Sequence, residues 1–172
     1  MISLWNSYGL IRKRLLNANK FGYKDKMMIE GVILTPLKQI YHPKGDVFHG
    51  MKKSDPGFTD FGEAYFSTIH AGEIKPWKKH FRMTLNLIVP VGKIRFVIHD
   101  DRTESPTWDE TMSIELGPEN YQRLTVPPGL WMAFEGIGET LNLLLNVADL
   151  EHDPEEVERA DPDRFVYPKK NK

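Results

Sequence analysis

A run of basic side chains between residues 75 and 82 is the first part of the sequence where chemistry can be expected. Lys78, His80 and Arg82 stand at alternate positions, so on an extended strand their side chains would point to one face. Three basic groups on one face would suit a diphosphate, which lysine and arginine bind through charge-assisted hydrogen bonds. The alternative is a solvated edge strand, where lysines discourage pairing with another sheet.

Polar and aromatic residues elsewhere extend this candidate site. Asn86 shares the parity of the basic residues and could donate a hydrogen bond to a sugar hydroxyl or carbonyl, although an exposed strand position is the alternative. Trp131 and Tyr65 could form an aromatic floor under a base or a sugar, but aromatic residues of β-folds more often lie in the core. For His80 itself, the alternative to a role in the site is a structural histidine.

Composition narrows the class of protein. The chain has 172 residues, of which 40% are hydrophobic, and this is enough for one domain with a substantial core. A net charge of −1 gives no general attraction to nucleic acid or membranes, and we expect neither as a partner. The absence of cysteine excludes disulfides, thiolate metal sites and cysteine nucleophiles. Without a long apolar segment or a secretory signal, the expected location is the cytoplasm.

Short apolar runs separated by glycine and proline predict an all-β fold. Residues 83–91 and 93–99 alternate with period two around Gly92, which predicts a β-hairpin. Roughly nine such runs at regular spacing are typical of a sandwich or barrel, and they favour a jelly roll. Asp100 and Asp101 are predicted to end the second strand and to fix the loop that follows.

The domain is expected to occupy residues 31–150. Residues 1–30 mix short apolar clusters with charges and are interpreted as a peripheral N-terminal segment or arm. Residues 151–172 are first acidic, then basic, and contain three prolines. We expect an irregular C-terminal tail there, with one short helix between Pro154 and Ala160.

Several blocks of the sequence resemble one family. Residues 100–107, Asp-Asp-Arg-Thr-Glu-Ser-Pro-Thr, resemble the Asp-Leu-Arg-x-x-Ser-Pro-Thr segment of the dTDP-4-dehydrorhamnose 3,5-epimerases. Residues 116–120 and 124–134 are similar to that family's Leu-Ser-x-Glu-Asn and Ile-Pro-x-Gly-x-x-x-x-Phe. The resemblance covers residues 30–155 approximately. It implies an RmlC-like cupin, which is a double-stranded β-helix jelly roll, typically a homodimer, that epimerises a nucleotide-linked 4-keto-6-deoxyhexose.

The resemblance also implies roles for individual residues. The family carries Arg-Gly-Leu-His-Tyr-Gln after a glycine, and an ungapped match places Lys75 at its arginine and Lys78 at its basic histidine. His80 resembles the second histidine of the His-x-His motif of cupins. Asp149 corresponds to the carboxylate that partners the base, and Glu63 replaces a substrate-binding glutamine.

The chain departs from the family at its acid tyrosine, whose region falls on Leu145 or Asn146. Two functions therefore stay open. One is a dTDP-sugar isomerase or epimerase of deoxysugar or surface polysaccharide biosynthesis, with His80 as the base beside the ketone. The other is a cupin that binds a sugar nucleotide without turnover.

A metal-dependent cupin is the third possibility, and the histidine count argues against it. Metal-binding cupins hold iron or manganese with two or three histidines and a glutamate. Here Lys78 takes the place of the first histidine and Met132 that of another. We expect no metal and no cofactor, and a nucleotide-linked sugar as the ligand.

Overall fold

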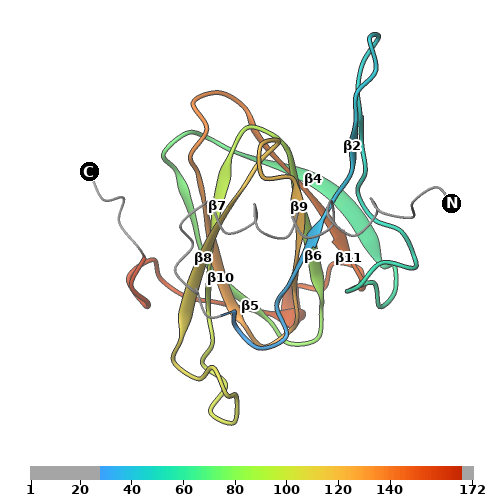
Figure 1. Cartoon of the computed structure of the whole chain (residues 1–172). Helices are drawn as coiled ribbons and strands as arrows, with labels where there is room; N and C mark the ends of the chain where they lie inside the picture. The colour runs from blue at the N-terminus through green and yellow to red at the C-terminus, as the bar shows by residue number, and fades with distance from the viewer. Residues whose placement is uncertain (1–27, 168–172) are drawn as a thin grey trace, which may run out of the picture.

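A computed structural model of the chain describes residues 28–167, and they form two antiparallel β-sheets packed face to face (Figure 1). Sheet I has the strand order β1-β9-β6-β11-β4, and sheet II has the order β12-β5-β10-β7-β8. The expected all-β jelly roll is confirmed. The strands of sheet I are β1 Ile33–Pro36, β4 Glu63–Ile69, β6 Leu85–Val91, β9 Gln122–Val126 and β11 Asn142–Ala148. Those of sheet II are β5 Ile74–His80, β7 Ile94–His99, β8 Thr111–Leu116, β10 Trp131–Gly136 and β12 Val157–Arg159.

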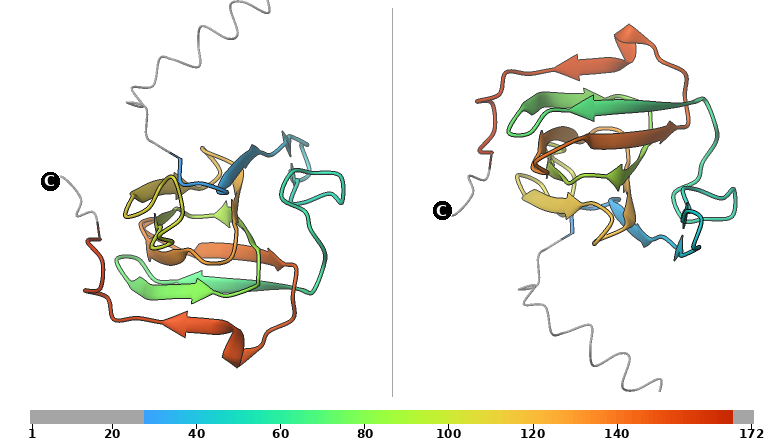
Figure 2. Two further views of the ribbon diagram at one scale, coloured as in Figure 1. Left: turned by 90° about the horizontal axis from the view of Figure 1, so that it is seen from below. Right: turned by 90° about the horizontal axis from the view of Figure 1, so that it is seen from above.

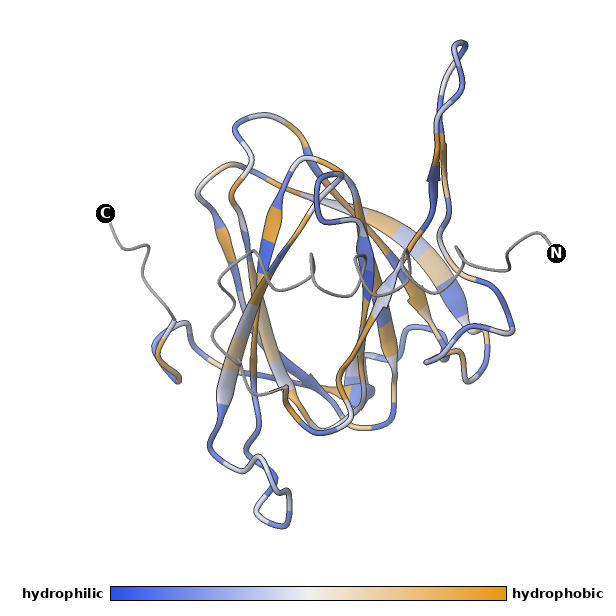
Figure 3. Ribbon diagram, in the orientation of Figure 1, coloured by the Kyte–Doolittle hydropathy of each residue, from blue (hydrophilic) through white to orange (hydrophobic). Residues whose placement is uncertain are grey.

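The two sheets enclose one main hydrophobic core, because alternate residues of each strand point inward. Figure 3 shows apolar residues concentrated along the strands, with polar residues in many of the connections. The core includes Leu85, Leu87 and Val89 of β6, Ile94, Phe96 and Ile98 of β7, and Leu144 and Ala148 of β11. The parity of these residues identifies the inner face of each strand.

The predicted hairpin of residues 83–91 and 93–99 is wrong. β6 pairs with β9 and β11 in sheet I, whereas β7 pairs with β10 and β8 in sheet II. The chain crosses between the sheets at Gly92, where φ is +77° and an added Cβ would lie 2.2 Å from the carbonyl oxygen of Leu141. Alternation of apolar and polar residues indicates that each strand has one buried face, but it does not indicate which strands pair.

The loop after β7 is held by Asp100, as predicted. Its buried carboxylate accepts hydrogen bonds from Arg102 Nε at 2.7 Å, Ser105 Oγ at 2.6 Å and Thr107 Oγ1 at 2.7 Å. Burial alone would raise the pKa of Asp100, but these donors lower it far below the ordinary value. The Ser-Pro-Thr block that carries the family resemblance is therefore a structural element.

The C-terminal region belongs to the fold beyond the predicted boundary at residue 150. A 3₁₀ helix, Pro154–Glu156, is followed by β12, which forms the edge of sheet II and pairs with β5 (Figure 2). The predicted short helix is thus reduced to one 3₁₀ turn. Of the predicted N-terminal segment, residues 1–27 lie outside the described residues, and Ile29 is buried in the core.

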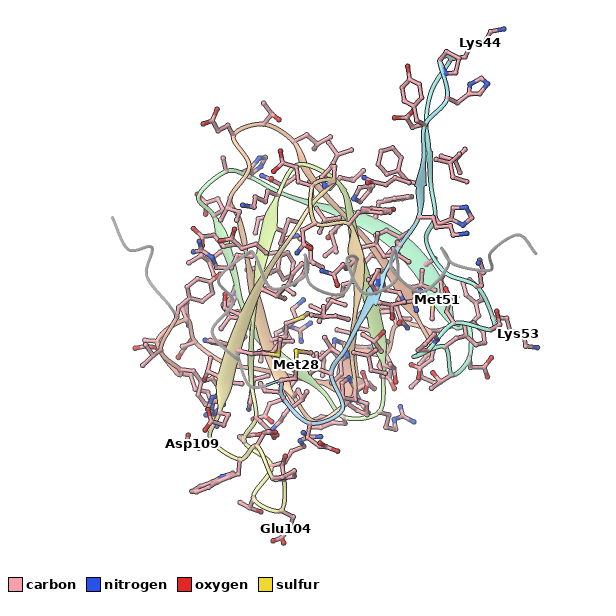
Figure 4. The ribbon with its side chains drawn as sticks, viewed as in Figure 1. Met28, Lys44, Met51, Lys53, Glu104 and Asp109 are labelled. Atoms are coloured by element: carbon pink, nitrogen blue, oxygen red, sulfur yellow. The ribbon has the colours of Figure 1, made fainter. Side chains whose placement is uncertain are left out.

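A narrow ribbon, β2 Gln39–Ile40 and β3 Val47–Phe48, projects from the sandwich. Figure 4 shows Lys44 at its tip, far from Glu104 in the loop after β7 at the opposite end of the molecule. Four of its large apolar side chains are exposed, namely those of Ile40, Tyr41, Val47 and Phe48. No helix within residues 28–167 has the length and apolar character needed to cross a membrane.

Candidate functional site

His80, the last residue of β5, has its imidazole ring hydrogen-bonded to a buried carboxylate. Nδ1 of His80 lies 2.7 Å from Oε2 of Glu156, whose side chain is 1% exposed. Because an ionised carboxylate only accepts, Nδ1 carries the proton, and Nε2 of the neutral ring keeps its lone pair. No group among residues 28–167 is hydrogen-bonded to Nε2. A histidine oriented in this way can act as a general base.

Glu156 is fixed at this position by backbone amides of the turn after β5. Its Oε1 accepts hydrogen bonds from the N–H of Arg82 and, at 2.8 Å, from that of Met83. Its own carbonyl oxygen accepts from the N–H of Phe81 at 3.1 Å. Burial alone would raise the pKa of Glu156, but the hydrogen bonds from His80 and the two amides lower it below the ordinary range. The carboxylate is therefore ionised at neutral pH.

Three cations lie on the same face of sheet II as His80. Lys78 is directly opposite Met132 of the core, and Arg159 of β12 is directly opposite Lys78. Lys75 is opposite Phe134, and its Nζ donates to the carbonyl oxygen of Thr68 at 2.9 Å. We call Lys75, Lys78 and Arg159 the cation cluster.

A β-bulge brings two members of the cation cluster together. Residues three apart on a regular strand point to opposite faces, but the register of β5 on β10 shifts between Lys75 and Lys78. Desolvation lowers the pKa of Lys78, and the charges of Arg159 and Lys75 lower it further. Water still reaches part of this side chain, so an anion can approach and stabilise the ammonium form.

Sheet I contributes polar groups to its own inner face. Asn146 of β11 is buried directly opposite Tyr65 of β4, and its Nδ2 donates to the Tyr65 hydroxyl at 3.2 Å. Because this oxygen accepts the amide hydrogen, the phenolic proton remains available for donation. Glu63 lies opposite Ala148 of the core, so this predicted residue is on the same face.

Two predicted substrate residues lie on outer faces, and both predictions are wrong. Trp131 is fully buried on the outer face of sheet II, where its indole N–H donates a hydrogen bond to Asp101 Oδ2 at 2.7 Å. Asn86 is buried on the outer face of sheet I, where its side-chain oxygen accepts a hydrogen bond from Thr125 Oγ1 at 2.7 Å. The parity of β5 does not carry over to Asn86, because β5 and β6 belong to different sheets.

Arg82 and Asp149 also differ from expectation. β5 ends at His80, and the Arg82 side chain is 66% exposed and paired with Asp153 at 3.3 Å. Asp149 accepts hydrogen bonds from the Thr84 amide and the Thr59 hydroxyl. The predicted pairing of Asp149 with the base is therefore wrong for His80, whose partner is Glu156.

Sequence reasoning missed Glu156, Arg159 and the Tyr65–Asn146 hydrogen bond as parts of the site. Glu156 and Arg159 were assigned to the tail, and only the pairing of β12 with β5 brings them to the inner face. A signal for the bulge did exist, because proline within a strand is typical of bulges and edges, and Pro76 stands between Lys75 and Lys78. Within residues 28–167, no three histidine, aspartate or glutamate side chains are grouped to hold a metal ion.

Comparisons with known proteins place the chain among sugar-modifying proteins. A dTDP sugar isomerase from Desulfovibrio desulfuricans G20 is 40% identical, with a TM-score of 0.77 over 79% of this chain and 87% of that one. The probable low-salt glycan biosynthesis epimerase Agl13 of Haloferax volcanii is 32% identical over 105 residues, or 60% of this chain. That match spans 65% of the relative's length, just under two thirds.

A second curated relative is more distant. The spore coat polysaccharide biosynthesis protein SpsL of Bacillus subtilis is 25% identical over 129 residues, which cover 75% of this chain and 85% of that protein. No protein-family model matches the chain.

Proposed function

Because the chain belongs to the RmlC-like cupin family of dTDP-sugar isomerases and epimerases, we propose that it transfers protons beside the ketone of a nucleotide-linked keto-sugar. The substrate class is dTDP-4-keto-6-deoxyhexose, used in deoxysugar or surface polysaccharide biosynthesis. The observation that carries the proposal is the His80–Glu156 hydrogen bond of 2.7 Å, which engages Nδ1 and leaves Nε2 of His80 without a hydrogen-bond partner among residues 28–167.

His80 is the general base of the proposed reaction. Its Nε2 takes a proton from the carbon beside the ketone, and the electron pair of the broken C–H bond moves onto the carbonyl oxygen to give an enolate. Glu156 stabilises the imidazolium that forms, because a nearby opposite charge favours the charged ring. It also keeps the ring in the tautomer with the proton on Nδ1.

The cation cluster supplies positive charge for two anionic groups. Lys78 follows the bulge and lies two residues before His80, so it is the member assigned to the enolate oxygen. Lys75 and Arg159 are assigned to the diphosphate. The lowered pKa of Lys78 means that binding of an anion recovers part of the cost of its desolvation.

The product depends on where the proton returns. Protonation of the same carbon from the opposite face gives an epimer, and Tyr65 is the donor assigned to that step. Return of the proton by His80 to the former carbonyl carbon, while the proton of the neighbouring hydroxyl passes to the former carbonyl oxygen, moves the ketone by one position and gives a ketoisomer. Both routes start from the same enolate, so the first step is common to both.

Deuterium exchange tests the proposal. In D₂O, the chain is expected to introduce deuterium at C3 or C5 of dTDP-4-keto-6-deoxyglucose, or to form a ketoisomer that NMR detects. The absence of both exchange and a ketoisomer, with any of several nucleotide-linked keto-sugars at high protein concentration, would exclude the proposal. Calorimetric binding of the same compounds without exchange would instead favour the sugar-nucleotide-binding function.

The proposal includes a homodimer and no metal ion. Support for the dimer comes from the projecting ribbon, where Tyr41 is 82% exposed and Val47 is 52% exposed, because apolar surface of this extent is usually covered by a partner. Light scattering is expected to give twice the mass of the chain, which is 19.9 kDa. A mass equal to one chain would contradict it, and stoichiometric bound metal would contradict the second part.

A further inference from the structure

Residues 160–167, which we call the C-terminal strap, cover the outer face of sheet II. The Phe165 ring stacks on His99 with 4.0 Å between centroids. It also meets the rings of Trp77 at 5.2 Å and Trp131 at 5.7 Å. Trp77 and Trp131 are 1% and 0% exposed. Phe165 is therefore the main aromatic anchor of the strap.

Polar contacts align the strap along the same face. The Ala160 amide donates to the carbonyl oxygen of Trp77 at 3.1 Å, and the Trp77 indole N–H donates to the carbonyl oxygen of Pro162 at 3.3 Å. The Arg164 guanidinium lies 5.0 Å from the centre of the Trp131 ring. These contacts attach the strap to the outer side of β5 and β10.

The strap directly follows β12, which is short and has little support of its own. β12 contains three residues, lies at the edge of sheet II and pairs only with β5. So short a strand, paired on one side, is marginal unless neighbouring packing stabilises it. Glu156 immediately precedes β12, so it stays beside His80 only while β12 remains on β5.

We propose that the C-terminal strap positions the proton-transfer site: docking of Phe165 on the outer face holds β12 against β5 and so keeps Glu156 on Nδ1 of His80. Phe165 is a positioning residue, because it acts from the opposite side of the sheet. The kinetic consequence rests on the proposed function. The effect on the histidine ring does not, since it follows from the hydrogen bond alone.

Undocking has a defined effect on the imidazole. Once β12 leaves β5, the donors on Phe81, Arg82 and Met83 lose their Glu156 acceptors, and Nδ1 of His80 loses its acceptor too. The proton is then free to occupy Nε2, the nitrogen that must be unprotonated in a general base. At the same time Trp77 and Trp131 become exposed to water.

The test compares Phe165→Ala with Val166→Ala in the full chain. Val166 is the next residue of the strap and is 86% exposed, so its truncation removes side-chain atoms without removing the anchor. Nitrogen-15 NMR of the imidazoles is expected to show His80 with its proton on Nδ1 in the wild type and in Val166→Ala, and a tautomer mixture in Phe165→Ala. Phe165→Leu, which retains an apolar anchor, is expected to restore much of the wild-type signal.

The kinetic expectation follows from the same geometry. A general base contributes about 10²–10⁴-fold to a rate, so partial loss of its orientation is expected to lower kcat about 10-fold in Phe165→Ala. KM is expected to rise as well, because Arg159, which is assigned to the diphosphate, lies on β12 and moves away from Lys78 with it. Unchanged His80 signals in a Phe165→Ala protein whose tryptophan fluorescence shows exposure would overturn the inference.

Hydrogen exchange in the wild-type protein gives a second test that needs no variant and no substrate. The Phe81 amide is bonded to Glu156 and the Ala160 amide to Trp77. If the strap holds β12, both amides open in one event and show equal protection. An Ala160 amide that exchanges much faster than the Phe81 amide would show that the strap opens alone, which overturns the inference. Equal protection with no catalytic turnover would refute only the proposed reaction.

Discussion

Replacement of Glu156 by glutamine is the sharpest perturbation of the proposed base, because it keeps the size of the side chain and removes its charge. The amide oxygen can still accept from the Arg82 and Met83 amides, as Oε1 does now. The NH₂ group then faces Nδ1 of His80 at the position of Oε2. Since NH₂ donates, Nδ1 must accept and the proton moves to Nε2.

The size of the effect follows from these contacts. Proton transfer by His80 is expected to fall about 10²–10⁴-fold, which is the full contribution of a general base. Folding should suffer less, by about 1–3 kcal/mol, because one hydrogen bond to a charged group is lost while the backbone amides keep an acceptor. The variant is therefore expected to be folded and inactive.

The pH dependence of stability tests whether Glu156 is an ionised, stabilising carboxylate in the folded protein. The pKa of Glu156 is lowered by folding from a reference of 4.5, so its contribution is complete above that value and is lost as the pH falls through the folded value. Glu156→Gln has no such group. As the pH is lowered from 5 through the folded pKa of Glu156, its free energy of unfolding should therefore fall less than that of the wild type.

The assay is deuterium incorporation in D₂O, followed by NMR and combined with urea unfolding of the same samples. Glu158→Gln is the matched control. Glu158 lies on β12, two residues after Glu156, and its side chain is 42% exposed and pairs with Lys79 on the outer face. The activity of Glu158→Gln should therefore be unchanged. A Glu156→Gln protein with the wild-type rate and pH profile would refute the assignment of His80 as a base held by Glu156.

Two further predictions concern the cation cluster and the loop after β7. Lys75→Met is expected to weaken calorimetric binding of dTDP about 10-fold, because Lys75 is assigned to the diphosphate and one charge-assisted hydrogen bond is lost. Lys53→Met, on an exposed loop, is the control, and equal affinity in both variants would remove Lys75 from the site. Asp100→Asn is expected to cost about 3 kcal/mol in urea unfolding, because Arg102 loses its buried partner. Since the folded pKa of Asp100 is lowered, this cost should be largest above the ordinary aspartate pKa and should shrink as the pH falls below it; a cost independent of pH would contradict the ion pair.

Features that depend on neighbours in the sequence were predictable. Asp100, Arg102, Ser105 and Thr107 lie within eight residues, and their hydrogen bonds form inside one loop. Most strands of the two sheets were predictable as well, because each has one face in the core, whereas β12 lies in the region expected to be an irregular tail. The pairing of strands was not: the period-two pattern around Gly92 fits a hairpin and a crossing between sheets equally well.

Features of the site that depend on distant pairing could not be read from the chain. His80 and Glu156 are 76 residues apart, and only the register of β12 on β5 brings them together. Residue type suggests Trp131 for the site, and alternation along the chain suggests Asn86, yet both side chains lie on outer faces. Alternation within one strand does not tell which residues face inward on a strand of the other sheet. Lys75 reaches the inner face through a bulge, which shifts parity within one strand.

The most direct test of the proposed function is the rate at which solvent deuterium enters the bound keto-sugar in wild-type protein and in His80→Asn, measured at saturating substrate. We expect exchange at C3 or C5 in the wild type and a loss of about 10²-fold or more in the variant, with dTDP binding retained. Equal exchange in both proteins would contradict it, because the proton would then be removed by a group other than His80.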